Sequence, residues 1–215
     1  GADLTCEMAM LIGRGAAAVL TSSTGHKPRI LIGKDTRQSG DMLEAALTAG
    51  LCSVGADVES LGVVPTPAVA YLVRKYNADA GVVISASHNP MEFNGIKIFA
   101  GTGYKLPDDV EEEIEAHIDD KCAGIPLATG DGVGRVTCRI DGIKDYVEHL
   151  YESIGGDLSG LNVCIDCANG ASAEVAQQLF PRLGAKCTFL GVSPDGRNIN
   201  AGVGSTHLDN LEKAV

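Results

Sequence analysis

The sequence has no tryptophan, and aromatic residues make up only 4% of its 215 positions. Proteins that bind single-stranded nucleic acid use aromatic side chains as stacking platforms, so this composition argues against that class. Basic residues are also scarce, with 17 Lys and Arg against 28 Asp and Glu, which gives a formal net charge of −11. Binding to duplex DNA or to RNA through a basic face is therefore not expected. A small anionic substrate is still compatible, because the local field in a cleft can oppose the net charge.

Long apolar runs are missing as well. No stretch approaches the roughly 20 apolar residues of a membrane span, and no signal peptide is visible. The first apolar segment contains Arg14, and no site typical of signal cleavage follows it. The seven cysteines are odd in number, and most lie in apolar segments, as is typical of reduced, buried thiols. These features predict a cytoplasmic protein that does not act at a membrane.

Two of the cysteines, Cys164 and Cys167, have the spacing of a redox or zinc motif. They lie in "LNVCIDCANG", which has the pattern of a strand. Residues three apart on a strand point to opposite faces, so the two sulfur atoms would not converge easily. The sequence has no second pair of this kind, and we do not expect a metal or redox site here.

Apolar strand patterns alternate with helical periodicity along the chain. Strands are expected at 29–33, 57–61, 80–85, 95–100, 134–140, 161–166 and 186–190. Helices are expected at 5–22, 41–55, 65–76, 107–118, 143–154 and 171–183, and Asp41 is the expected N-cap of the second one. The alternation predicts an α/β fold made of repeated αβ domains with mostly parallel, mixed sheets.

An internal repeat suggests how the chain is divided. "GADVESLGVVP" (55–65) and "GAKCTFLGVSP" (184–194) share six residues at identical offsets, and each follows an apolar strand and a helix. The segment 121–134 between them is rich in glycine and small residues, as is typical of a loop near a boundary. We therefore predict one domain at 1–139 and a second, duplicated αβ unit at 140–215.

The segment 81–97, "GVVISASHNPMEFNGIK", begins as a buried strand and becomes polar at Ser87-His88-Asn89-Pro90. In open α/β sheets, ligands bind at the carboxyl ends of the strands, where Ser87 is expected. Pro90 restricts Asn89 to an extended conformation, so this loop is predicted to present its side chains outward. Lys97 follows closely on the next strand.

Three interpretations of this loop can be compared. Ser87 as a hydrolase nucleophile with His88 as its base is disfavoured, because the G-x-S-x-G elbow is missing and adjacent side chains on an extended loop point apart. A purely structural loop, whose polar side chains satisfy backbone groups at a strand end, is the simplest alternative. In the third, Ser87 carries a phosphoryl group covalently, while Lys97, His88 and backbone N–H groups stabilise its oxygens and a divalent cation offsets its charge.

The stretch "SASHNPMEFNGIK" resembles the phosphoserine loop of the α-D-phosphohexomutases. Four other stretches resemble the bacterial phosphoglucosamine mutases within that superfamily: "GKDTRQSGDMLEAAL", "VVPTPAVAYL", "DCANGA" and "PDGRNINAGVGSTH". The similarity runs in order through essentially the whole chain, and the loop motif is long and specific. The resemblance therefore favours the third interpretation.

The resemblance implies the reaction and the role of each residue. Phosphorylated Ser87 would exchange its phosphate with glucosamine 6-phosphate through a 1,6-bisphosphate and yield glucosamine 1-phosphate, a precursor of amino-sugar nucleotides and the cell wall. Lys97 matches the family lysine that assists proton transfer, and His88 and Asn89 match residues that frame the phosphoserine. Mg²⁺ would sit on the phosphate of Ser87, and glucose or glucosamine 1,6-bisphosphate would be the activator or intermediate. A homodimer is a further expectation.

The chain also departs from the family pattern. The family's N-terminal T-D-G-x-R-G loop and its Asp-rich D-G-D-G-D-R magnesium loop are not found, and neither are the later domains that recognise the sugar and its phosphate. We therefore expect about the first half of such an enzyme, inactive by itself. A phosphomannomutase/phosphoglucomutase and a non-catalytic fold module are the alternatives. Asp35 and Arg37 are expected to form a structural ion pair or a domain contact and not a catalytic pair.

Overall fold

The computed structural model describes residues 4–215 of the chain. Its larger sheet has five strands in the order β4-β3-β1-β2-β5. They are β1 (Arg29–Lys34), β2 (Asp57–Val63), β3 (Ala80–Ile84), β4 (Ile96–Ala100) and β5 (Val136–Cys138). All pairings are parallel except that of β3 with β4, which is antiparallel. The expected mixed, mostly parallel α/β fold is confirmed.

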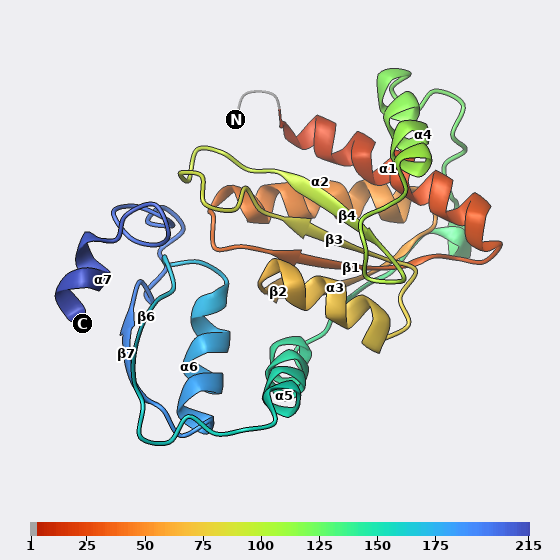
Figure 1. Cartoon of the computed structure of the whole chain (residues 1–215). Coiled ribbons are helices and arrows are strands. Elements are labelled where there is room, and N and C mark those ends of the chain that lie inside the picture. Colours follow the sequence, from red (N-terminus) through yellow and green to blue (C-terminus); the bar gives the residue numbers. More distant parts are fainter. Residues whose placement is uncertain (1–3) are drawn as a thin grey trace.

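Helices cover both faces of this sheet. They are α1 (Cys6–Thr24), α2 (Ser39–Ser53) and α4 (Asp108–Asp119) on one face and α3 (Thr66–Lys75) on the other (Figure 1). Successive residues of the central strand β1 enter different cores, because side chains alternate across a strand. Ile30 and Ile32 pack with the side chains of α1 and α2, whereas Leu31 packs with those of α3. This two-sided burial explains why β1 and β3 are continuous apolar runs.

Helices α1 and α2 approach each other backbone to backbone. A Cβ atom on Gly13 would lie 2.4 Å from the carbonyl oxygen of Leu47, and one on Gly50 would lie 2.2 Å from that of Met10. Only glycine fits at such separations, so these two residues set the distance between the helices. Gly13, in the stretch "IGRG" of α1, therefore has a packing role against α2.

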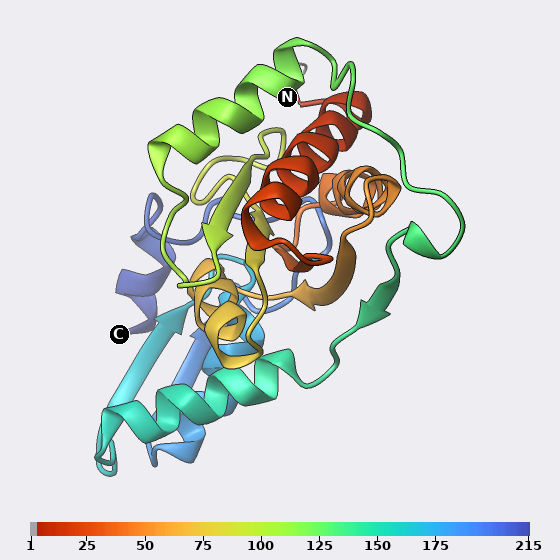
Figure 2. The same ribbon diagram turned by 90° about the vertical axis from the view of Figure 1, so that its right-hand side faces the viewer.

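The rest of the chain forms a smaller unit. It contains α5 (Gly142–Ile154), the parallel strands β6 (Asn162–Asp166) and β7 (Lys186–Leu190), α6 (Ser172–Arg182) and the short α7 (Asp209–Ala214). We call residues 4–139 the large-sheet region and residues 140–215 the small-sheet region. Figure 2 shows α5 running along the large-sheet region, beside α3. Tyr146 of α5 and Leu179 of α6 share one hydrophobic core with Leu72 of α3.

The two segments of the internal repeat have the same topology. In both β1–α2–β2 and β6–α6–β7, a helix connects two directly paired parallel strands. This agreement in strand order and direction confirms the expected strand–helix–strand pattern. The expected domain boundary after residue 139 falls between β5 and α5, and a division into two domains stays a prediction because one core spans both regions.

Three local details differ from the sequence-based expectation. The expected N-cap Asp41 lies inside α2, which begins at Ser39, and its carboxylate instead pairs with the ammonium of Lys34 at 2.5 Å. Strand β5 is shorter than expected, with all three residues exposed, and α7 was not expected. None of the helices described between residues 4 and 215 is long and apolar enough to cross a bilayer.

Candidate active site

Ser87 follows the buried strand β3 at the carboxyl edge of the large sheet. Strand β3 is buried along its whole length, and its pairing ends where the Ser85 N–H donates to the Gly95 carbonyl at 2.9 Å. Ser85 is still buried, whereas Ser87 is exposed. Beyond that last bond the backbone leaves the sheet, so the loop projects from its edge. The expected accessible position of Ser87 at a strand end is confirmed.

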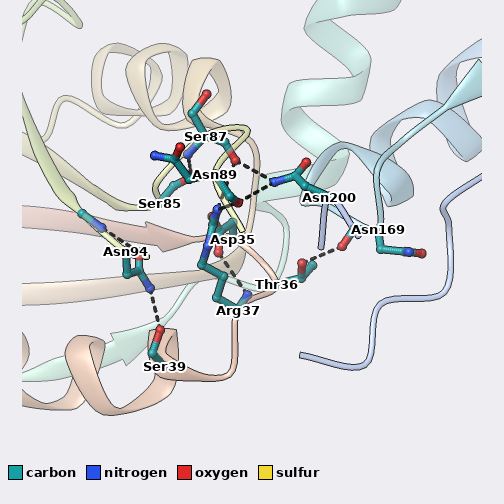
Figure 3. Close-up of polar contacts among 11 residues, drawn as sticks. Asp35, Thr36, Arg37, Ser39, Ser85, Ser87, Asn89, Asn94, Asn169 and Asn200 are labelled. Atoms are coloured by element: carbon teal, nitrogen blue, oxygen red, sulfur yellow. Dashed lines mark hydrogen bonds and ion pairs between the residues drawn. The ribbon is translucent and has the colours of Figure 1, made fainter. Parts of the chain in front are cut away.

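The backbone of Ser87 is left-handed, with φ of 57°. A residue with a Cβ pays roughly 1–2 kcal/mol in this region, so other contacts must hold it there. One of them is the Ser87 N–H, which donates to the Ser85 hydroxyl oxygen at 3.1 Å. Figure 3 shows the Ser87 hydroxyl pointing away from its own carbonyl, toward the outside of the loop. The bend therefore presents the hydroxyl and turns the backbone carbonyl toward the protein.

The buried side chain of Arg37 binds the Ser87 carbonyl from inside the protein. Its side chain is fully buried, and its Nη2 donates to the carbonyl oxygens of Ser87, at 3.2 Å, and of Asn89, at 2.6 Å. Its Nη1 donates to the carboxylate of Asp35, which also accepts the Arg37 backbone N–H at 3.0 Å. The expected ion pair of Asp35 and Arg37 is confirmed. Its contact with the Ser87 loop was not foreseen from the sequence.

The small-sheet region contributes a second donor. Asn200 Nδ2 donates to the same two carbonyl oxygens, of Ser87 and of Asn89, both at 3.0 Å (Figure 3). The sequence analysis missed Asn200. A signal was present, since Asn before Ala-Gly in a glycine-rich loop suits the left-handed backbone that Asn200 adopts, with φ of 58°.

Ser87 faces a hollow between the two regions, with a volume of about 290 Å³. The large-sheet region lines it with Ser85, Ser87 and the first residues of α3, and the small-sheet region with Asn200 and the first residues of α6. The N-terminal ends of helices carry partial positive charge, so both helices favour an anion in this hollow. Ser87 thus lies where a phosphoryl group would be stabilised.

The structure does not gather all the expected site residues around Ser87. His88 is exposed on the same loop, and Asn89 is held through its backbone carbonyl. Lys97 lies on β4 opposite Val83, is exposed, and lines a different hollow, of about 560 Å³, beside α1 and α4. Within the described chain, the Lys97 side chain forms no hydrogen bond or ion pair with the Ser87 loop.

The expected magnesium site does not fit the residues present. Among residues 4–215, no group of three His, Cys, Asp or Glu side chains is placed to hold a metal ion. Asp35 lines the hollow, but its carboxylate already pairs with Arg37. Mg²⁺ in proteins is usually held through carboxylate oxygens, and among the described residues that line the hollow Asp35 supplies the only carboxylate.

The two cysteines of the Cys164-x-x-Cys167 spacing lie at the end of a strand. Both cysteines are free thiols; Cys164 lies in β6, and Cys167 follows the end of that strand. Burial, and next the nearby Asp166 carboxylate, raise the pKa of the Cys167 thiol. Cys167 lines the hollow, and the raised pKa keeps it in the weakly nucleophilic thiol form at neutral pH.

Comparison with known proteins agrees with this geometry. Residues 1–123 match the family described as phosphoglucomutase/phosphomannomutase, alpha/beta/alpha domain I. The match covers more than half of the chain, so the chain belongs to the phosphoglucomutase/phosphomannomutase family. The Ser87 loop lies inside the matched segment.

Within this family, the chain is similar to proteins named phosphoglucosamine mutase. The chain is 57% identical over 213 residues to phosphoglucosamine mutase of Acetivibrio thermocellus, which covers 99% of this chain and 47% of that protein. It is 54% identical over 209 residues to phosphoglucosamine mutase of Clostridium acetobutylicum, covering 97% and 46%. The chain therefore spans about half the length of these curated relatives.

Solved structures show the same fold. A phosphoglucomutase/phosphomannomutase family protein from Burkholderia thailandensis superimposes with a TM-score of 0.75 at 27% identity, over 90% of this chain and 42% of that one. A putative phosphomannomutase from Thermus thermophilus gives 0.74 at 23% identity, over 91% and 44%. The arrangement of the two regions thus has counterparts in this family.

Proposed function

We propose that this chain is the phosphoserine-bearing part of a phosphohexose mutase, and that Ser87 carries the phosphoryl group. The observation that carries the proposal is the Ser87 loop. A left-handed bend places an exposed hydroxyl over the hollow, while buried Arg37 fixes the carbonyl behind it. A merely structural serine at a strand end would not need a fully buried arginine beneath its backbone.

The reaction is a reversible phosphoryl exchange. A sugar hydroxyl attacks the phosphorus on Ser87, the new P–O bond to the sugar forms, and the P–O bond to Ser87 Oγ breaks. The hydroxyl proton goes to a base, and Ser87 Oγ takes up a proton as it leaves. In the return step Ser87 Oγ loses that proton and attacks the other phosphorus of the sugar bisphosphate, whose P–O bond to the sugar breaks, and the released sugar oxygen is protonated. The partially positive ends of α3 and α6 stabilise the phosphoryl oxygens throughout, which is the main requirement of phosphoryl transfer.

We assign supporting roles to the neighbouring side chains. His88 is exposed beside Ser87 and is proposed to contact the phosphoryl oxygens, together with the amide of Asn89. Lys97 is proposed to assist proton transfer at the sugar hydroxyl, an assignment that rests on the family resemblance because Lys97 lies outside the Ser87 hollow. General acid–base help of this kind is typically worth 10²–10⁴-fold in rate.

The proposed substrate is glucosamine 6-phosphate, converted to glucosamine 1-phosphate. The support is the identity above 50% to proteins named phosphoglucosamine mutase, against 27% and less to the solved phosphoglucomutase/phosphomannomutase relatives. We also propose that the chain alone does not catalyse the reaction, because no three His, Cys, Asp or Glu side chains of the described residues are grouped to hold a metal ion. Mg²⁺ therefore rests on the family resemblance alone, and no step is assigned to it.

The test is transfer of label from a ³²P-labelled hexose 1,6-bisphosphate to a protein that carries this sequence at the full length of its relatives. We expect the wild type to be labelled at Ser87, and Ser87→Ala to take no label and lose turnover entirely, since it removes the acceptor oxygen. Lys97→Ala should keep the labelled serine but turn over 10²–10⁴-fold more slowly.

Ser172→Ala is the matched control, because Ser172 is another hydroxyl that lines the same hollow but lies outside the loop. It should still be labelled at Ser87, as peptide mapping would show. Label or turnover in Ser87→Ala would contradict the proposed function.

A further inference from the structure

Two donors from different regions of the chain share the same pair of acceptors. Arg37 Nη2 bonds the carbonyl oxygens of Ser87 and Asn89 from the large-sheet region, and Asn200 Nδ2 bonds both from the small-sheet region. A carbonyl oxygen has two lone pairs, so each of these oxygens accepts the two bonds it can hold. The loop carbonyls are therefore saturated only when both regions are in place.

Asn200 is itself held firmly. Its backbone is left-handed, and its N–H donates to the Ala168 carbonyl at 2.9 Å. Two further bonds fasten neighbouring loops of the small-sheet region to the segment before α2. Thr36 Oγ1 donates to the Asn169 carbonyl at 2.6 Å, and the Gln38 N–H donates to the Gly196 carbonyl at 2.9 Å. The amide of Asn200 thus reaches the Ser87 loop from an anchored position.

The bonds of Asn200 act on the backbone bend that aims the hydroxyl. The left-handed conformation of Ser87 is unfavourable for a residue with a Cβ, and a loop freed from its donors relaxes toward ordinary backbone angles. Such a relaxation would rotate the Ser87 Oγ away from the hollow. In-line transfer is sensitive to such changes, because a displacement of about 1 Å can cost about 10²-fold in rate.

We propose that Asn200 is a positioning residue for phosphoryl transfer at Ser87, acting as the donor by which the small-sheet region holds the phosphoserine loop in its bent conformation. This inference rests on the proposed function of Ser87. It makes the contact between the two regions a requirement for transfer and not only for stability.

The choice of side chain allows a sharp test. Asn200→Gly keeps a residue that tolerates the left-handed backbone and removes only the amide. Asn200→Asp keeps the shape but replaces the donor with an acceptor, which then faces two carbonyl oxygens. The control is Asn210→Ala, which removes an amide bonded to the Gly202 carbonyl at 3.0 Å, in the same region but away from the Ser87 loop.

The first measurement is amide hydrogen exchange on the chain itself. In Asn200→Gly we expect the loop amides of Ser87 and Asn89 to lose about tenfold in protection, on the scale of one or two hydrogen bonds, and Asn200→Asp to lose at least as much. Strand β3 should stay protected in both variants, and Asn210→Ala should match the wild type. Unchanged loop protection, or loss of protection in β3 as well, would overturn the proposal.

The second measurement is single-turnover and steady-state kinetics in the full-length protein. Asn200→Gly should lower kcat by about 10- to 100-fold with KM nearly unchanged, because the amide positions the phosphoryl donor and does not bind the sugar. Loop loosening with unchanged kcat would overturn the role in transfer. A wild type that takes no ³²P label on Ser87 would overturn the proposed function and this role with it, whereas a labelled wild type with unchanged kcat in Asn200→Gly would overturn this role alone.

Discussion

The large-sheet and small-sheet regions use the same strand–helix–strand unit in different surroundings. In the first, β1 and β3 are covered on both faces, and their central residues are buried. In the second, no residue of β6 or β7 is fully buried, and their helix α6 turns Val175 and Leu179 toward the core around α3. The first unit lies inside a large two-sided core, whereas the second has a small core of its own around Ala173 and Ala176 and also packs its helix against α3.

The difference bears directly on the site. The bent loop of Ser87 leaves the well-packed strand β3, while Asn200 comes from a loop of the less buried unit. A fully buried strand thus leads into the Ser87 loop, and a less buried unit supplies the second donor to the carbonyls of that loop. Substitutions at matched positions in the two regions can show whether this difference in burial is also a difference in the free energy of unfolding.

The ion pairs should differ most. Asp35→Ala leaves the buried guanidinium of Arg37, 0% exposed, without its counter-charge, so we expect a loss of about 3–5 kcal/mol in the free energy of unfolding. Glu148→Ala breaks the pair with Arg182 in the small-sheet region, where the side chains are 45% and 40% exposed and solvent screens the charges. That variant should be nearly neutral in urea unfolding, and equal losses in the two variants would contradict the contrast.

Strand leucines should differ next. Leu31→Ala in β1 empties a fully buried site, which typically costs about 2–5 kcal/mol. Leu190→Ala in β7 changes a half-buried site that solvent can fill, and about 1 kcal/mol is expected. Thermal and urea unfolding of both variants would measure the difference. A loss for Leu190→Ala as large as that for Leu31→Ala would show that β7 is packed as tightly as β1.

The smallest effect is expected at the contact between the regions, where the Tyr76 hydroxyl donates to Asp145 at 2.5 Å. Burial, and next the bond to Asp145, raise the pKa of Tyr76. A raised pKa in the folded state gives stability that is complete below the unfolded value of about 10 and lost as the pH rises above it. In Tyr76→Phe, the decline in unfolding free energy above pH 10 should become shallower.

The decline should not vanish in that variant, because burial also raises the pKa of Tyr146 and of the Cys52 thiol, and each of these groups adds to the loss of stability at alkaline pH. Tyr146→Phe is the matched control, because burial alone raises the pKa of the Tyr146 hydroxyl, without a hydrogen bond to a carboxylate. If the unfolding free energy of Tyr76→Phe and of the wild type fell equally above pH 10, Tyr76 would not contribute to the alkaline loss of stability.

Sequence reasoning captured what local pattern determines. Apolar periodicity located the strands and helices of both regions, and the position of Ser87 after a buried strand predicted its exposure. The predicted N-cap of α2 was wrong, because the Asp41 carboxylate can either cap a helix or pair with a lysine. Its carboxylate pairs with Lys34 from another element and does not cap α2, and no local signal reveals that choice.

Long-range polar contacts were beyond the sequence. Asn200 lies 113 residues from Ser87, and nothing in either segment indicates that the amide of one bonds the carbonyl of the other. The sequence predicted only one contact of Arg37, its ion pair with Asp35. The bond of Arg37 to the Asn89 carbonyl depends on how the loop after β3 folds back, which the sequence does not indicate. Family resemblance named Lys97, yet the hollow that it lines is not that of Ser87.

The separation of Asn200 from Ser87 also sets an order of events during protein synthesis. Chains grow at about 5–20 residues per second and fold from the N-terminal end, so the large sheet can form while the small-sheet region is still being made. The 113 residues that separate the serine from its amide donor correspond to roughly 6–23 s of synthesis. Until Asn200 has been made, Arg37 is the only one of the two side-chain donors that can bond the carbonyls of Ser87 and Asn89.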